Sequence, residues 1–179
     1  MTNIRFLTTV DVLAYQSLLK QGIHKKIEVM AWKFQTPRCL NETNLTLLLS
    51  KDTPNYLTFG AFEGDELIGA VTLIHNQNYS LAHKAMVENL CVNKDDALAR
   101  EHVLKLLMQN VFDVCRKRNI EILMASLVSN NISGKVFFSN LNFEMFVIEQ
   151  HARKYEDNYV DEHWFIYNFS ENANDIFNT

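Results

Sequence analysis

The acidic residue that points most clearly to chemistry is Glu88, in the middle of an apolar stretch over residues 84–92. We expect this stretch to be the central strand of a sheet, with Leu90 and Val92 on the same parity as Glu88. A carboxylate among such neighbours loses solvation, which suits it to accept the proton of an ammonium substrate. The alternative is a structural glutamate that pairs with a lysine such as Lys84 at the rim of the sheet.

Cysteine and histidine spacing gives no sign of a metal or redox site. The three cysteines, Cys39, Cys91 and Cys115, are an odd number without Cys-x-x-Cys spacing, so we expect reduced thiols. Cys91 has no accompanying histidine or asparagine pattern, and a small core residue is the stronger interpretation than a nucleophile. The six histidines include no ligand spacing such as His-Glu-x-x-His, so no metal is expected.

The composition predicts one globular domain over residues 1–179. With 47% hydrophobic and 21% charged residues, a chain of 179 residues can bury one core without disulfides or metal. A formal net charge of −4 offers no basic excess, so neither nucleic acid nor membrane is an expected partner. The first residues lack the apolar region of a signal peptide, and no window reaches about 18 apolar residues, so we expect a cytoplasmic protein.

Hydrophobic periodicity predicts the elements that must position these residues. The first helix begins at Thr9 or Asp11, runs through Leu19 and is closed by Gly22. The other helices are expected at residues 41–50, from 93–96 to 116–118 with Asn119 as a left-handed cap, and at 131–140. Strands are expected at residues 3–8, 56–62, 67–75, 84–92, 120–128, 144–155 and 162–169. This order predicts an α/β (α+β) domain with a mixed sheet and helices on both faces.

Four local patterns in this order resemble the GCN5-related N-acetyltransferase (GNAT) family over about residues 3–170, leaving 171–179 as a tail. The hairpin over residues 59–71, Phe-Gly-Ala-Phe-Glu-Gly-Asp-Glu-Leu-Ile-Gly-Ala-Val, resembles the family's second and third strands. Val-Glu-Asn-Leu-Cys-Val at 87–92 is similar to its fourth strand. Residues 131–143 resemble the pattern Asn-x-x-Ala-x-x-apolar-Tyr-x-x-x-Gly-Phe without a gap, and Asp-Glu-His-Trp-Phe-Ile-Tyr resembles the closing strand.

The resemblance implies a mostly antiparallel sheet of about seven strands and acetyl-CoA as co-substrate. Its pantetheine arm would enter a gap between the fourth and fifth strands. Glu88 would be the catalytic base, and Leu90, Cys91 and Val92 would contact the arm and the thioester through backbone groups. Asn131 matches the asparagine that touches the CoA arm in the family; it could equally cap the following helix, and both roles are compatible.

The expected phosphate-binding loop departs from the family pattern. The family uses Gln/Arg-x-x-Gly-x-Gly/Ala, whereas residues 98–103 read Leu-Ala-Arg-Glu-His-Val and contain no glycine. Asp95, Asp96 and Glu101 add negative charge close to where phosphates would lie. The residues left to contact phosphate are Ala99, Arg100 and His102, and solvated helix residues are the alternative interpretation.

Two further positions bear on transfer itself. Phe138 occupies the position of the family's tyrosine, which protonates the leaving thiolate. The resemblance therefore implies that Phe138 contacts the cofactor. Glu28 and Trp32 fall on a segment that lines the acceptor site in relatives. Together with Glu156, Asp157, Asp161 and Glu162 they would favour a cationic amine, although an ordinary acidic surface explains them nearly as well.

The sequence therefore predicts a GNAT-like N-acetyltransferase that moves an acetyl group from acetyl-CoA to an amine of a small molecule or protein. The amine would attack the thioester directly, with Glu88 as base. The alternative is a degenerate member that binds CoA or a protein partner without turnover, or an assembly subunit with an empty cleft. The sequence leaves a homodimer open.

Overall fold

The computed structural model describes residues 1–24, 40–155 and 157–171 of the chain. Four residues considered above, Glu28, Trp32, Cys39 and Glu156, lie outside the described residues. The predicted acceptor-side positions Glu28 and Trp32 therefore stay predictions.

Seven strands form one sheet in the order β1-β2-β3-β4-β5-β7-β6. The strands are β1 (Thr2–Phe6), β2 (Tyr56–Glu63), β3 (Glu66–His75), β4 (Lys84–Val92), β5 (Ile122–Val128), β6 (Glu144–Tyr155) and β7 (Asn158–Asn168). Neighbouring strands run antiparallel, except β4 and β5, which are parallel. The predicted mixed, mostly antiparallel sheet is confirmed, with β4 at its centre.

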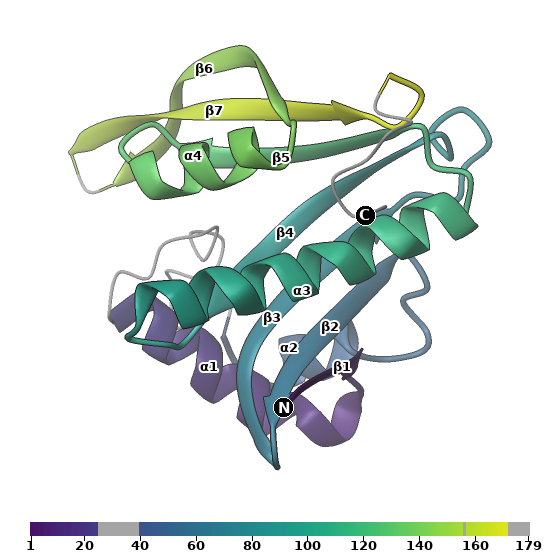
Figure 1. Ribbon diagram of the computed structural model, residues 1–179, viewed down its shortest axis with the longest axis vertical. Coiled ribbons are helices and arrows are strands. Elements are labelled where there is room, and N and C mark those ends of the chain that lie inside the picture. The colour runs from purple at the N-terminus through teal and green to yellow at the C-terminus, as the bar shows by residue number, and fades with distance from the viewer. Residues whose placement is uncertain (25–39, 156, 172–179) are drawn as a thin grey trace.

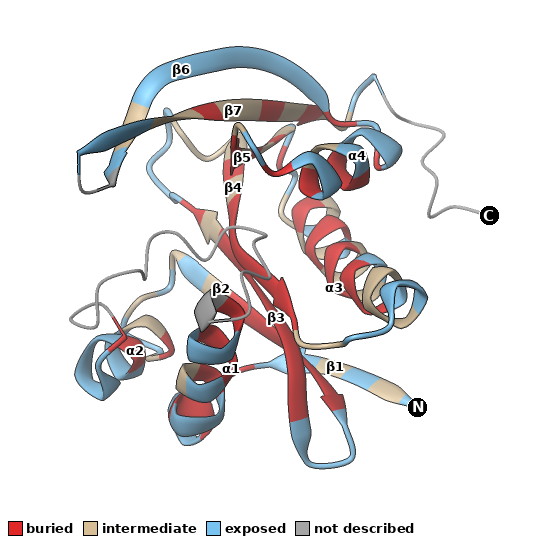
Figure 2. Ribbon diagram, turned by 90° about the vertical axis from the view of Figure 1, so that its left-hand side faces the viewer, coloured by how far each residue is buried: buried red, intermediate tan, exposed pale blue. Residues whose placement is uncertain are grey.

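Helices cover both faces of the sheet, as predicted. They are the 3-10 helix η1 (Thr9–Asp11), α1 (Val12–His24), α2 (Glu42–Leu48), α3 (Ala97–Lys117) and α4 (Ile132–Asn140). The helices α1 and α2 lie on one face, and α3 and α4 lie on the other (Figures 1 and 2). We call these the α1 face and the α3 face. The observed element order is the predicted one.

Local capping explains where the helices next to the candidate site begin and end. Asp96 accepts a hydrogen bond from Ala99 N at 2.7 Å and so starts α3, and Asn119 has a φ of 54° just beyond its end, as predicted. Gly22 does not close α1, which continues to His24. Gly22 is buried, and packing of α1 on the sheet outweighs the roughly 1 kcal/mol that glycine costs inside a helix.

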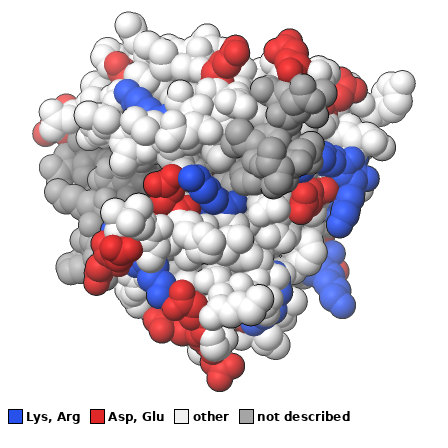
Figure 3. All heavy atoms as spheres, viewed as in Figure 1, with Lys and Arg blue, Asp and Glu red and all other residues white. Residues whose placement is uncertain are grey.

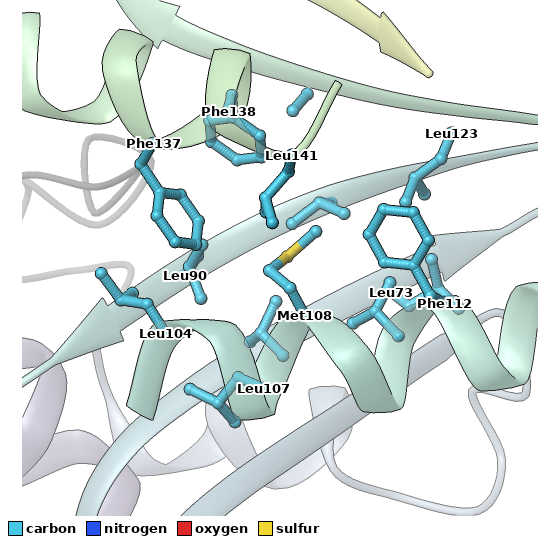
Figure 4. Close-up of a cluster of buried hydrophobic side chains, with 14 of the residues drawn as sticks. Leu73, Leu90, Leu104, Leu107, Met108, Phe112, Leu123, Phe137, Phe138 and Leu141 are labelled. Atoms are coloured by element: carbon cyan, nitrogen blue, oxygen red, sulfur yellow. The ribbon is translucent and has the colours of Figure 1, made fainter. Parts of the chain in front are cut away.

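The core on the α3 face fills the space between α3, α4 and the sheet (Figure 4). Its largest contributors include Leu90 of β4, Met108 and Phe112 of α3, and Phe137 and Phe138 of α4. A second, smaller core on the α1 face packs α1 and α2 against β2, β3 and β4. The central strand β4 contributes side chains to both, which makes its alternation decisive for the site.

Surface charge and hydropathy add little beyond the composition. On the face shown in Figure 3, Lys and Arg are interspersed with Asp and Glu and do not gather into one basic patch. None of the described helices is long and apolar enough to cross a membrane. In the described ranges, no group of three or more His, Cys, Asp or Glu side chains is placed to hold a metal ion.

Candidate active site

The parallel strands β4 and β5 pair over only four residues each and then diverge (Figure 1). The last pair is Val87 with Ala125; from residue 88 onward β4 keeps its partners on β3 but has no ladder partner on β5 among the described residues. Backbone groups on that side of β4 are the kind that an extended ligand can pair with as an added strand. We call this region the β4–β5 divergence.

A β-bulge at Asn89 sets the direction of every side chain beyond it. Asn89 has a φ of 53°, and the β3–β4 register shifts between the pair Thr72–Glu88 and the pair Ala70–Cys91. The extra residue reverses the alternation of β4. Leu90 consequently packs in the core on the α3 face, while Cys91 packs in the core on the α1 face.

The expectation that Glu88 shares a face with Leu90 and Val92 is therefore wrong. Glu88 is on the α1 face, opposite Thr72, and is 9% exposed. It is the first residue of β4 beyond the last pair with β5. The bulge thus separates the carboxylate from the apolar side chains that follow it. The end of the β4–β5 pairing at Val87 places Glu88 at the mouth of the divergence.

The three residues after the bulge offer backbone groups and no reactive side chain. Leu90, Cys91 and Val92 are all buried. Burial raises the pKa of the Cys91 thiol to about 12, so at neutral pH it carries almost no thiolate. This supports the interpretation of Cys91 as a core residue.

The start of α3 holds charges that are already paired with the protein. The Asp96 carboxylate caps the helix by accepting from Ala99 N. Arg100 donates through Nε to the carbonyl of Lys94 at 2.8 Å and through an Nη to that of Asp95 at 3.0 Å, so it ties the preceding loop to the helix. Lys94 Nζ lies 2.6 Å from Glu63 Oε2. His102 is exposed on α3.

The region of α4 confirms one predicted contact and explains one departure. Asn131 caps α4 by accepting from Gly134 N at 2.9 Å, as predicted. Phe138 is fully buried, with its ring centroid 5.0 Å from that of Phe143 and 5.6 Å from that of Phe137. Asn142 replaces the glycine of the family pattern and adopts a φ of 62°, a conformation that asparagine tolerates better than most residues.

A hydrogen-bond network at the divergence was not predicted. Ser126 of β5 donates to Glu162 Oε1 of β7 at 3.1 Å, and Arg153 of β6 donates to the same oxygen at 2.8 Å. The sequence offered one signal, a serine in the middle of an apolar strand, but the partners come from two later strands. Glu162 is thus ion-paired with an arginine, and its expected part in an acidic acceptor lining stays a prediction.

A cavity of about 590 Å³ lies elsewhere, between β1, the end of α2 and the start of β2. Its lining includes Thr8, Ser50, Thr58 and Arg118 and contains none of the predicted site residues. The candidate site therefore rests on the β4–β5 divergence and not on this cavity.

The seven-stranded sheet, split between β4 and β5, defines the class of fold. A family model described as an acetyltransferase (GNAT) domain matches residues 4–164. The chain belongs to the GNAT family of acetyltransferases.

Solved structures agree with this assignment. A probable acetyltransferase from Staphylococcus epidermidis is 37% identical with a TM-score of 0.81, over 94% of this chain and 99% of that one. An N-acetyltransferase from Staphylococcus aureus is 26% identical with a TM-score of 0.73, over 95% and 99%. A Salmonella typhimurium protein described as an acetyltransferase, and crystallised with its cofactor acetyl-CoA, has the same fold. It is 13% identical with a TM-score of 0.75, over 96% of each chain. Among curated proteins no match is found.

The residues at the divergence fit the arm of acetyl-CoA better than those at α3 fit its phosphates. The edge of β4 beyond Val87 offers backbone partners for amide groups. At α3, by contrast, the Asp96 carboxylate occupies the N–H of Ala99, one of the donors that would otherwise meet a phosphate. The loop before α3 contains no glycine, and Arg100 stabilises it by donating to the carbonyls of Lys94 and Asp95.

Proposed function

We propose that this protein transfers the acetyl group of acetyl-CoA to a primary amine, of a small molecule or a protein, at the β4–β5 divergence. The observation that carries the proposal is the position of Glu88: a carboxylate on the first residue beyond the last β4–β5 pair, 9% exposed. Acetyl-CoA supplies an activated acyl group with a thiolate leaving group.

Glu88 performs the proton transfer in this proposal. Its carboxylate takes one proton from the acceptor ammonium, which leaves a lone pair on nitrogen. That lone pair forms the C–N bond as the C–S bond breaks, and the electron pair departs on sulfur. The nitrogen then carries one proton too many for an amide, and this second proton passes through solvent to the thiolate, so the products are the neutral amide and free thiol. A backbone N–H of residues 90–92 stabilises the negative charge that develops on the carbonyl oxygen.

A second candidate function is cofactor or partner binding without turnover. It is favoured by Phe138, which has no proton to give to the leaving thiolate, and by the Asp96 carboxylate at the start of α3. A thiolate leaves without full protonation, because a thiol has a pKa of only about 8.5, so Phe138 slows the reaction without forbidding it.

Release of free thiol from acetyl-CoA, measured with 2-phenylethylamine, spermidine and lysine amide, tests this proposal. Glu88→Gln should lower kcat at neutral pH by about a hundredfold or more, since general base catalysis contributes about 10²- to 10⁴-fold. The loss should shrink as pH rises and free amine accumulates.

Glu66→Gln, an exposed glutamate at the start of β3, is the matched control and should keep full activity. Binding of acetyl-CoA, followed by calorimetry, should be unchanged in both variants. Acetyl-CoA binding by the wild type without acetylation of any amine would select the second candidate function. Unchanged turnover in Glu88→Gln would remove Glu88 from the mechanism.

A further inference from the structure

Two polar residues, one on each strand, occupy the first positions beyond the last β4–β5 pair. Because Val87 pairs with Ala125 and the strands are parallel, Glu88 and Ser126 are the next residue on each strand. They lie on the same face of the sheet, since the preceding alternate residues Met86 and Met124 are a pair. A group that enters the divergence on the α1 face therefore has a carboxylate on one side and a hydroxyl on the other.

The hydroxyl of Ser126 has a fixed direction. Its hydrogen is donated to Glu162 Oε1, 3.1 Å away. A serine oxygen that has donated its one hydrogen keeps two lone pairs and acts only as an acceptor toward anything else. The Ser126 oxygen can therefore accept a hydrogen bond from an N–H group of a ligand, but it has no hydrogen to donate to a ligand acceptor.

The carboxylate that orients Ser126 is itself held in place. Arg153 donates to Glu162 Oε1 through an Nη at 2.8 Å and through Nε at 3.3 Å, and the Glu162 side chain is only 8% exposed. A carboxylate buried to this extent needs such a partner, because removal from water disfavours its charged form. The arginine thus holds the Glu162 oxygen in place as an acceptor for the Ser126 hydroxyl.

The outer strands are irregular at the point that brings this arginine in. The β6–β7 register shifts between Glu149 and Arg153, and His151 in that interval has a φ of 54°. His151 N donates to Asp161 Oδ1 at 2.8 Å, which holds the bulge to β7. Pairing then resumes with Arg153 opposite Val160. A bulge re-aims the side chains that follow it, and here the side chain that follows is Arg153.

We propose that Ser126 binds the acceptor nitrogen across the divergence from Glu88, and that Glu162 and Arg153 are positioning residues that fix its hydroxyl as an acceptor. This inference rests on the proposed acetyl transfer. A primary ammonium has three N–H bonds: one is used by Glu88 in deprotonation, and a second is held by Ser126. The pair of residues therefore requires an ammonium with at least two N–H bonds, one for Glu88 and one for Ser126.

Ser126→Ala tests the binding role with the three amines named above. KM for the amine should rise about tenfold or more, as expected for loss of a hydrogen bond to a charged donor. The Kd of acetyl-CoA should stay within about twofold. Ser126→Thr keeps the hydroxyl and should restore most of the affinity.

Two matched controls separate this role from a structural one. Ser50→Ala removes a half-buried serine that also donates to a carboxylate, Asp52 Oδ2 at 3.2 Å, and should leave KM unchanged. Glu162→Gln should raise the amine KM about threefold, because a neutral amide accepts more weakly than a carboxylate. Asp11→Asn, which breaks the equivalent ion pair with Arg5, should not change KM.

The outcomes distinguish the two proposals. An unchanged amine KM in Ser126→Ala, together with loss of turnover in Glu88→Gln, would overturn this inference and leave the proposed function standing. Equal weakening of amine and acetyl-CoA in Ser126→Ala would also overturn it, since the serine would then act on the fold or on the cofactor. A wild-type protein that acetylates none of the amines would overturn both.

Discussion

Two arginine–carboxylate pairs, one on each side of the β4–β5 divergence, use the same chemistry for different ends. In the N-terminal half Arg5 lies 2.7 Å from Asp11, and in the C-terminal half Arg153 lies 2.8 Å from Glu162. Both carboxylate side chains are 8% exposed. By distance and by burial of the carboxylate the two pairs are nearly indistinguishable.

The second partner of each carboxylate, beside its arginine, distinguishes the two pairs. Asp11 accepts from the backbone N–H of Thr8 at 2.9 Å and so closes the capping box that starts η1 and α1. Glu162 instead accepts from the hydroxyl of Ser126, which stands at the candidate site. We expect the pair whose carboxylate also binds a backbone N–H to stabilise the fold. We expect the pair whose carboxylate also binds a side chain at the candidate site to orient that side chain.

The largest effect on stability is therefore expected in the N-terminal half. Asp11→Ala should lower the free energy of unfolding by about 1–2 kcal/mol, because it removes both a helix cap and an ion pair. Acetyl transfer per folded molecule should not change. Asp11→Asn retains an acceptor for Thr8 and should cost less; urea unfolding of the three proteins measures both losses.

The pH dependence of that loss has a definite sign. Arg5, mainly through its hydrogen bonds, holds the pKa of Asp11 below its usual value. A carboxyl whose pKa is lower in the folded than in the unfolded state stabilises the fold at pH values above the unfolded pKa of about 3.9. This stabilisation is lost as pH falls through the folded pKa. The difference between wild type and Asp11→Ala should be constant from about pH 8 to 5 and shrink below about pH 4. A difference that grows on acidification would contradict the assignment.

A third acidic residue, Asp96, sharpens the comparison, because it caps a helix where a ligand phosphate is expected. Asp96→Asn keeps a cap of similar strength and removes the charge. CoA should bind about two- to fivefold more tightly at low salt, and the gain should fade as salt screens the charge. Calorimetry with pantetheine, which lacks the phosphates, is the control. An equal gain for pantetheine would show that the loop has rearranged.

The smallest effect is expected at Cys91, a buried titratable group with no charged partner among the residues that the structure describes. Burial raises its pKa to about 12, so it has no thiolate to offer at neutral pH. Cys91→Ala should leave kcat within about twofold of wild type, because a buried neutral thiol behaves as a small apolar residue. A large loss of kcat with an unchanged thermal midpoint would instead indicate a nucleophile.

Local rules predicted the elements, but not the two register shifts that shape the candidate site. Asn119 and Asn131 were foreseen as caps, since capping depends on a few neighbouring residues. The bulge at Asn89 was not, because an asparagine in an apolar strand reads as one more alternating residue. Its consequence, the face on which Glu88 lies, could not follow from parity alone.

The Ser126 network was beyond sequence reasoning for a related cause. It joins β5, β6 and β7, and Arg153 reaches Glu162 only after a register shift in β6. Such pairing depends on how three strands align, and a one-residue change in register would send each side chain to the other face.

Amide hydrogen exchange with and without acetyl-CoA tests most directly that the divergence is the cofactor site. We expect new protection in peptides that contain residues 88–92 and 126–128, where β4 and β5 have no pairing with each other. Peptides over residues 48–58, which line the cavity beside β1 and α2, should exchange as before. Protection confined to residues 48–58, or none at 88–92 while acetyl-CoA is bound, would contradict the account.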